Sequence, residues 1–214
     1  MGDGLSDPLS DRVSGRRHEP LEGICAATAV GILLAAGAGE PGAGLFLVLT
    51  LGALLILRRL RLPSTLELCF SIGILLQGWG NALPLFEQVG WYDKAVHFLT
   101  PMLVVPSLYV LLVRAGALWP PWESGRLRRG TLGAVAVTVA IGTALATIWE
   151  LLEGSADRLL GMSLAHGYWE TIDDLYSSFF GSLAAGAVLA WWLARGAGEL
   201  APESLASEAL AESE

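Results

Sequence analysis

Residues 130–149 read GTLGAVAVTVAIGTALATIW and contain no charged side chain. A helix needs about 20 apolar residues to cross the hydrocarbon core of a bilayer, and this run has that length. Glu150 follows it at once and Glu153 comes three residues later, so the apolar segment ends on two carboxylates. This stretch predicts a transmembrane helix with acidic groups at one end.

The rest of the chain has the same character. Of its 214 residues, 53% are hydrophobic and 16% are charged, whereas soluble domains usually carry about 25% charge. We predict spans at 22–39, 43–60, 66–86, 95–114, 130–152 and 175–194. The fold class is therefore expected to be all-α, a polytopic transmembrane helical bundle of six spans.

One domain accounts for the apolar part of the chain. We expect the bundle to occupy residues 21–195, between a disordered cytoplasmic tail at 1–20 and an acidic cytoplasmic tail at 196–214. The first tail mixes Gly, Ser, Pro and both charges, which bury too little apolar surface to order a chain. A cleaved signal peptide is the alternative for the first span, but its apolar stretch is long for one.

Basic residues indicate the orientation. All but two of the 13 Lys and Arg residues flank the first span, lie in the second or fourth connection, or follow the sixth span. The exceptions are Lys94 and Arg158. Since loops that stay in the cytoplasm are enriched in Lys and Arg, both termini are expected there. Glu150 and Glu153, which end the apolar run, are then expected at the outer membrane boundary.

Asp93 and His97 lie where the fourth span begins. They are four residues apart, about 40° around a helix, and so share a face. A carboxylate beside an imidazole fixes its tautomer and raises its basicity, for metal binding or for proton transfer. The alternatives are an acid that merely favours a helix start and a histidine that is merely packed. Pro101 and Pro106 are expected to kink this span and open a cavity near His97.

Carboxylates repeat at the end of the fifth span. Glu150, Glu153 and Asp157 form one stripe at spacings of three and four residues. Like charges repel there, and a helix C-terminus disfavours acids. We expect a cation, shared protons or a basic partner to offset this cost.

The third group of polar residues enters the sixth span. Thr171 and Asp174 have the spacing of a capping box, and Asp173 is expected to favour the helix start. Asp174 is also in register with Ser178 and Gly181, which allows it to face the bundle interior. Further candidates of lower rank are Glu170, Asn81 and Gln77, the last two expected to form hydrogen bonds between helices. Trp91, Trp149 and Trp169 adjoin the polar residues and are candidates for the walls of a site.

Three motifs carry a family resemblance. They are Trp-Tyr-Asp-Lys-x-x-His-Phe at 91–98, Glu-Leu-Leu-Glu at 150–153 and Glu-Thr-x-x-Asp-Leu at 170–175. With the intervening helices, they cover residues 65–190 of a chain that resembles the YjdF-like bacterial inner-membrane proteins and, more distantly, the VanZ-like proteins. The resemblance implies a polytopic bundle, and the association of VanZ-like proteins with glycopeptide resistance points to the cell envelope. Two departures are Glu170 in place of Asp, and Ser178 where relatives often have Asn.

These observations lead to a hypothesis of a site at the outer membrane boundary. Glu150, Glu153 and Asp174 would hold Mg²⁺ or Ca²⁺, which prefer oxygen ligands. His97, oriented by Asp93, would act as general acid or base on a lipid-linked envelope molecule. We expect the lipid bilayer as a partner, no nucleic acid, and a location in the bacterial inner membrane. The alternatives are a non-catalytic assembly or accessory protein and a proton-coupled transporter.

Overall fold

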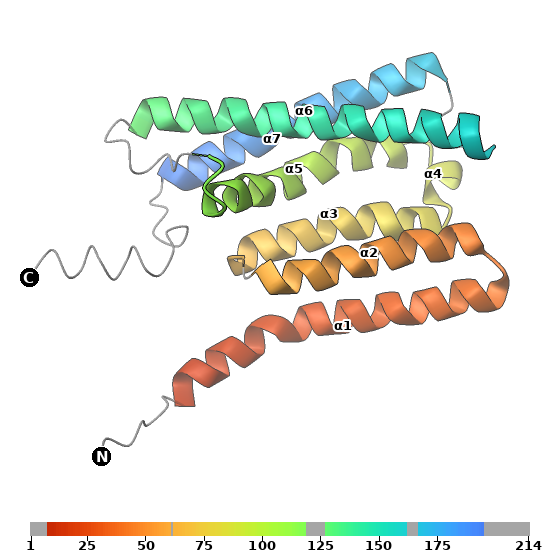
Figure 1. The fold of residues 1–214 in the computed structure, drawn as a ribbon, viewed down its shortest axis with the longest axis horizontal. Coiled ribbons are helices and arrows are strands. Elements are labelled where there is room, and N and C mark those ends of the chain that lie inside the picture. The colour runs from red at the N-terminus through yellow and green to blue at the C-terminus, as the bar shows by residue number, and fades with distance from the viewer. Residues whose placement is uncertain (1–7, 61, 119–126, 162–166, 195–214) are drawn as a thin grey trace, which may run out of the picture.

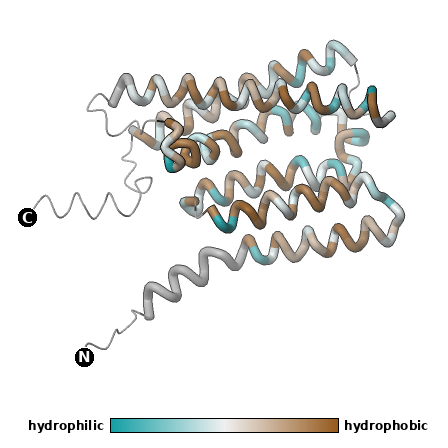
Figure 2. The backbone as a smooth tube through the Cα atoms, in the orientation of Figure 1, coloured by the Kyte–Doolittle hydropathy of each residue, from teal (hydrophilic) through white to brown (hydrophobic). Residues whose placement is uncertain are grey.

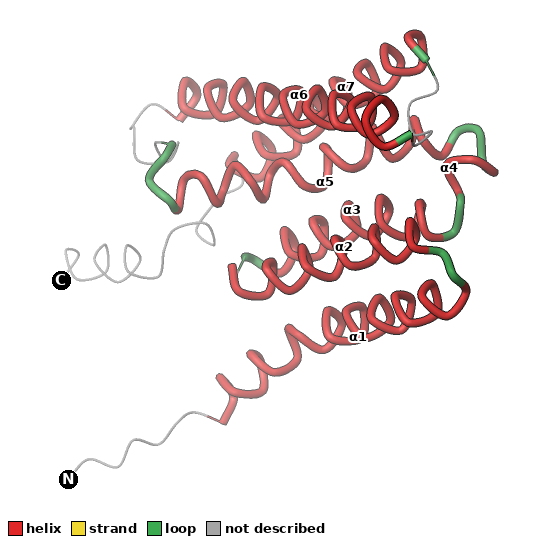
Figure 3. The backbone as a smooth tube through the Cα atoms, turned by 45° about the vertical axis from the view of Figure 1, so that its right-hand side comes forward, coloured by secondary structure: helices red, strands yellow, loops and turns green. Residues whose placement is uncertain are grey.

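The computed structural model describes residues 8–60, 62–118, 127–161 and 167–194, and in these ranges the secondary structure is helical (Figure 3). The helices are α1 Pro8–Ala38, α2 Pro41–Leu60, α3 Ser64–Ala82, α4 Leu85–Gln88, α5 Tyr92–Arg114, α6 Leu127–Leu160 and α7 Tyr168–Ala194. The all-α helical bundle predicted from the sequence is therefore confirmed.

The helices form two groups that meet between α3 and α5 (Figure 1). Helices α1, α2 and α3 pack in chain order, while α5, α6 and α7 all contact one another. Buried residues of α2, α3, α5, α6 and α7 form an apolar core that includes Leu57, Val110 and Leu189. This core lies toward the end where α5 and α7 finish, so the opposite end is left for polar side chains.

Among the described residues, five helices are long and apolar enough to cross a membrane. They are the segments Leu21–Ala38, Pro41–Leu60, Tyr92–Arg114, Gly130–Leu159 and Tyr168–Leu193. The predicted number of six is wrong by this criterion, because α3 carries Glu67, Gln77 and Asn81 among its apolar residues. Helix α3 nonetheless runs between α2 and α5 (Figure 1). Figure 2 shows the most hydrophilic segments mainly toward the helix ends.

The first helix begins earlier in the chain than the predicted first span. Helix α1 begins at Pro8, so residues 8–20 are helical, whereas a disordered tail was expected there. Extending an existing helix costs little, since each added residue also adds a backbone hydrogen bond. The predicted acidic tail at 196–214 lies outside the described residues. Helix α1 begins and α7 ends at the same end of the bundle (Figure 1).

Glycine ends two of the long helices. Gly39 follows α1 with φ +75° and Gly161 follows α6 with φ +67°. This left-handed conformation costs glycine little and is the usual way to stop a helix. Pro41 then starts α2, where its missing N–H leaves no helical hydrogen bond unmade. The chain can therefore reverse direction within a few residues.

Close packing of α5 on α7 fixes the level at which the polar residues meet. A Cβ atom at Gly181 would collide with the backbone of Phe98, so the two helices touch backbone to backbone there. Small residues permit such approaches in membrane bundles. Tyr92 also ties the start of α5 to α3, because its hydroxyl donates to the Leu76 carbonyl at 2.6 Å. Pro101 and Pro106 lie within α5, which is helical from Tyr92 to Arg114.

Candidate functional site

Three helices bring ionisable side chains to one place. Helix α5 supplies Asp93 and His97, α6 supplies Glu150 and Glu153, and α7 supplies Asp174. Their ligand atoms form two groups, within each of which the atoms lie within 4.8 Å of one another: Asp93–His97–Asp174 and His97–Glu150–Glu153. His97 belongs to both groups and is only 8% exposed. The five principal candidates from the sequence thus lie around one imidazole ring.

The two nitrogens of His97 face different partners. Nδ1 lies 3.2 Å from Ser178 Oγ, whereas Nε2 lies 3.5 Å from Asp93 Oδ1 and 3.8 Å from Glu150 Oε1. If Nδ1–H donates to Ser178, the lone pair of Nε2 points toward the carboxylates. Two ligands bound at about 2.1 Å to a tetrahedral cation would lie roughly 3.4 Å apart. The Nε2 distances are close to that separation and too long for good hydrogen bonds.

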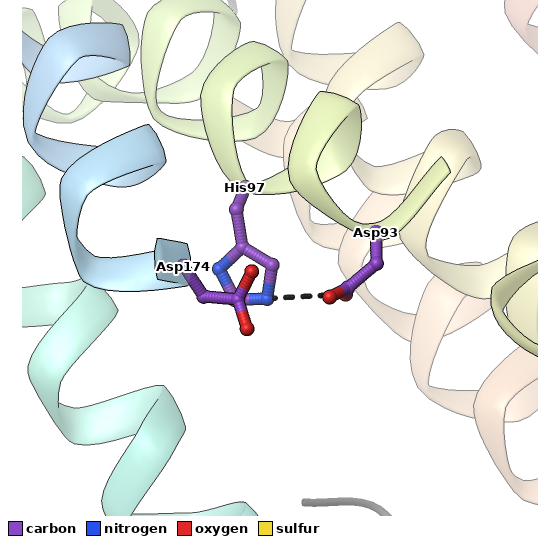
Figure 4. A group of neighbouring side chains, drawn as sticks. All are labelled: Asp93, His97 and Asp174. Carbon is purple, nitrogen blue, oxygen red and sulfur yellow. Dashed lines mark ion pairs between the residues drawn. The ribbon is translucent and has the colours of Figure 1, made fainter. Parts of the chain in front are cut away.

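Asp174 is the most deeply buried carboxylate of the group. It is 2% exposed, and its Oδ1 has no hydrogen-bond partner among the described residues. Figure 4 shows its carboxyl group beside the His97 ring, with Asp93 reaching the ring from the other side. Asp93 and Asp174 are also close enough to form a hydrogen bond with each other. Two carboxyl groups approach in this way only if they share a proton or a cation.

Polar partners on α6 and α7 hold the two glutamates. The Thr171 hydroxyl donates to Glu150, and Trp149 donates to Glu153. Glu150 Oε1 is buried and has no hydrogen-bond partner among the residues described. The Thr171 N–H donates to the Gly167 carbonyl, so Thr171 lies inside α7 and its predicted capping-box role is wrong. The Thr171 side chain therefore does not cap α7 and instead bonds to Glu150 of α6.

The remaining candidates divide between the site and its surroundings. Asp173 is exposed and pairs with Lys94 at 3.5 Å, outside the buried group. Glu170, one turn before Asp174, interacts electrostatically with both His97 and Glu150. Asn81 donates to the Gln77 carbonyl of its own helix, and its predicted hydrogen bond to another helix is not found among the described residues.

A cavity of about 350 Å³ adjoins His97, and Thr100 and Ser178 also line it. Gln77 and Trp149 help to line it, whereas Trp91 and Trp169 are exposed side chains.

Ser178 contacts the candidate site, and sequence reasoning missed it. It was noted only for its register with Asp174 and for standing where relatives have Asn. In the structure it is 2% exposed and is the hydrogen-bond partner of His97 Nδ1. The signal was its position one turn after Asp174, which places both side chains on the α5 face of α7.

Comparison with known proteins agrees with a helical membrane protein. An uncharacterized protein of Thermotoga maritima is 23% identical over 122 residues, which is 56% of this chain and 59% of that relative's length. No solved structure matches the chain. Residues 23–195 match the family described as "Predicted membrane protein (DUF2238)", a range that includes every residue of the site. The chain therefore belongs to the DUF2238 family of membrane proteins.

Proposed function

We propose that this membrane protein binds a divalent cation between Asp93, His97 and Asp174. The observation that carries the proposal is the Asp174 carboxylate, buried with an oxygen that lacks a hydrogen-bond partner among the described residues. A buried charge is costly unless it is paired or binds a metal. The nearby Lys94 ammonium pairs with Asp173. A cation between Asp93 and Asp174 would remove both the desolvation cost and the repulsion between the two carboxylates.

The ligand set favours a cation that accepts both nitrogen and oxygen. The sequence hypothesis was Mg²⁺ or Ca²⁺ on Glu150, Glu153 and Asp174, with His97 free to act as a base. The geometry groups the residues differently, since His97 belongs to both sets of potential ligands. Imidazole with carboxylates suits Zn²⁺ or Mn²⁺, whereas Mg²⁺ and Ca²⁺ prefer oxygen alone. We therefore expect Zn²⁺ to bind more tightly than Mg²⁺ or Ca²⁺.

Glu150 then has a chemical role available that differs from metal binding. Its Oε1 lies 3.8 Å from His97 Nε2 and lacks a hydrogen-bond partner in the described part of the chain. A bound Zn²⁺ supplies a water of lowered pKa, and a nearby carboxylate can accept the proton of that water. This arrangement suits attack on a phosphate or ester group of an amphipathic or lipid-linked envelope molecule. Glu153, held by Trp149, would be a further acceptor for the proton.

The topology supports a place for this site at the outer face of the bacterial inner membrane. Helix α1 begins and α7 ends at one end of the bundle, and Asp93 lies at the other, in the first turn of α5 (Figure 1). Arg58 and Arg114 lie near the end that carries the termini. The resemblance to YjdF-like and VanZ-like envelope proteins remains a prediction in keeping with this orientation.

Replacing Asp174 with Asn separates the role of the cation from structural support. We expect Asp174→Asn to lose Zn²⁺ binding and yet, in the absence of metal, to be more stable than the wild type. A buried charge without a partner is costly, and a neutral group of the same shape removes that cost. The measurement is the midpoint of thermal unfolding in detergent, with and without Zn²⁺.

Asp173→Asn is the matched control, since Asp173 is exposed and pairs with Lys94. This variant should keep the full stabilisation by Zn²⁺. Glu150→Gln should change the affinity for Zn²⁺ by only a few-fold. Loss of Zn²⁺ binding in Glu150→Gln but not in Asp174→Asn would place the cation in the His97–Glu150–Glu153 group and refute the proposal. A metal-free Asp174→Asn protein that is less stable than the wild type would instead indicate a shared proton.

Removing the Ser178 hydroxyl tests the orientation of His97. Ser178→Ala should weaken Zn²⁺ binding about 10–100-fold, because the hydrogen bond that fixes a ligating histidine typically contributes that much. Ser177→Ala, one residue earlier on the same helix, should leave the affinity unchanged. Titration of Zn²⁺ by isothermal calorimetry measures both. Equal affinities of the two variants would show that His97 needs no support from Ser178.

A further inference from the structure

The cavity beside His97 has one polar end and long apolar walls. His97, Gln77 and Ser178 lie at the polar end, and the walls include Val104 and Leu145. Ligand sites of about 300–1,000 Å³ commonly combine such walls with a few polar groups. The volume of about 350 Å³ is within that range. This shape fits a molecule with a polar group and one apolar arm.

The walls of the cavity open between α3 and α6. Both helices pack on α5, but in the described part of the chain they do not pack on each other. The lining residues Leu145, Ile148 and Leu152 of α6 are exposed and lie within the membrane-crossing segment Gly130–Leu159. In a bilayer these exposed leucine and isoleucine side chains face hydrocarbon. The opening is therefore toward lipid.

One hydroxyl inside the cavity indicates where a ligand would form a hydrogen bond. Thr100 lines the cavity one turn after His97, and its buried hydroxyl has no hydrogen-bond partner among the described residues. A buried hydroxyl without a partner costs free energy, and a ligand oxygen would satisfy it. In a phospholipid, the ester oxygens lie between the headgroup and the hydrocarbon chain. Thr100 has the corresponding place, between His97 and the apolar walls.

We propose that the crevice between α3, α5 and α6 binds one acyl chain of a membrane phospholipid, which enters sideways from the bilayer. The ester group of this lipid accepts a hydrogen bond from Thr100, and its headgroup lies at His97. A membrane phospholipid would then be the substrate class of the proposed function. Only the reaction at the headgroup rests on that proposed function, because binding of the acyl chain does not need the cation. The chain site can be tested without any metal.

The test uses phosphatidylglycerol with a photoreactive diazirine in one acyl chain, added to the full-length protein in detergent. After illumination, mass spectrometry locates the labelled residues. We expect labelling at Thr100 and Leu145 that excess unlabelled phosphatidylglycerol suppresses. Ala146→Phe, which fills the cavity from α6, should reduce this labelling at least about tenfold, since each displaced methylene is worth about fourfold in affinity.

Two further variants make the result decisive. Leu151→Phe adds an aromatic ring to α6 at an exposed position that does not line the cavity, and it should leave the labelling unchanged. Leu145→Trp narrows the opening at an exposed position, and it should reduce labelling even if Ala146→Phe fails to fold. Labelling that is insensitive to Leu145→Trp and to competing lipid would overturn the proposal. If labelling persists in a protein that binds no Zn²⁺, the chain site stands and the cation site alone has failed.

Discussion

His97→Ala is expected to abolish Zn²⁺ binding, with an affinity at least about 100-fold below that of the wild type. Residues that merely orient a metal ligand contribute 10–100-fold, and a ligand itself contributes no less. In the described part of the chain, His97 is the one residue common to both groups of potential ligands, so no rearrangement among the carboxylates replaces its nitrogen. Calorimetric titration of the purified protein with Zn²⁺ measures the change.

His97→Gln provides the control for volume. Glutamine fills much of the space left by the imidazole but offers no nitrogen lone pair at Nε2. It should therefore fold better than His97→Ala and still fail to bind Zn²⁺. Binding that survives in both variants, with the affinity of the wild type, would show that the carboxylates act without His97.

Gly181→Ala is expected to cause the largest loss of stability of any single methyl group added to the bundle. The added Cβ would collide with the Phe98 backbone, which cannot turn away as a flexible side chain can. Overpacking usually costs about 1–3 kcal/mol of stability. Because the added Cβ atom meets backbone atoms, we expect a cost at or above the top of that range. Because Phe98 follows His97 directly, displacement of α7 also pulls Ser178 from the imidazole. We expect a lower unfolding midpoint in detergent together with weaker Zn²⁺ binding.

Gly133→Ala is the matched control for this substitution. Gly133 lies within α6, and a Cβ atom there would meet nothing within 4 Å. Alanine favours a helix over glycine by roughly 0.5–1 kcal/mol, so this variant should be as stable as the wild type or slightly more stable. A Gly181→Ala protein that unfolds at the same midpoint as Gly133→Ala would refute the tight contact of α5 with α7.

The pairing of polar residues within one helix could be predicted because their spacing along that helix is fixed. Asp93 and His97 are four residues apart and Glu150 and Glu153 are three apart, so each pair shares a helix face whatever surrounds it. The charge-free run at 130–149 likewise predicted a membrane segment, which the structure extends into the longer helix α6. Local periodicity and the cost of burying charge were sufficient for both.

Contacts between helices were much harder to predict. They depend on how far each helix is rotated and shifted along its neighbour, which one sequence does not fix. Thr171 was assigned to a helix cap because α7 was expected to start late, yet the helix begins at Tyr168 and Thr171 bonds to Glu150. Ser178 was missed as the partner of His97 for the same reason. The grouping of carboxylates around the imidazole was likewise visible only once α5, α6 and α7 were packed.

The central claim is that Asp93, His97 and Asp174 hold one divalent cation. X-ray absorption at the Zn edge of the loaded, purified protein tests it most directly, because the technique reports the atoms bound to the metal. We predict one imidazole nitrogen and carboxylate oxygens at about 2.0–2.2 Å, as found in protein zinc sites. The same spectrum should be lost in Asp174→Asn and retained in Asp173→Asn. A zinc spectrum without imidazole, or one that is identical in Asp174→Asn, would contradict the account.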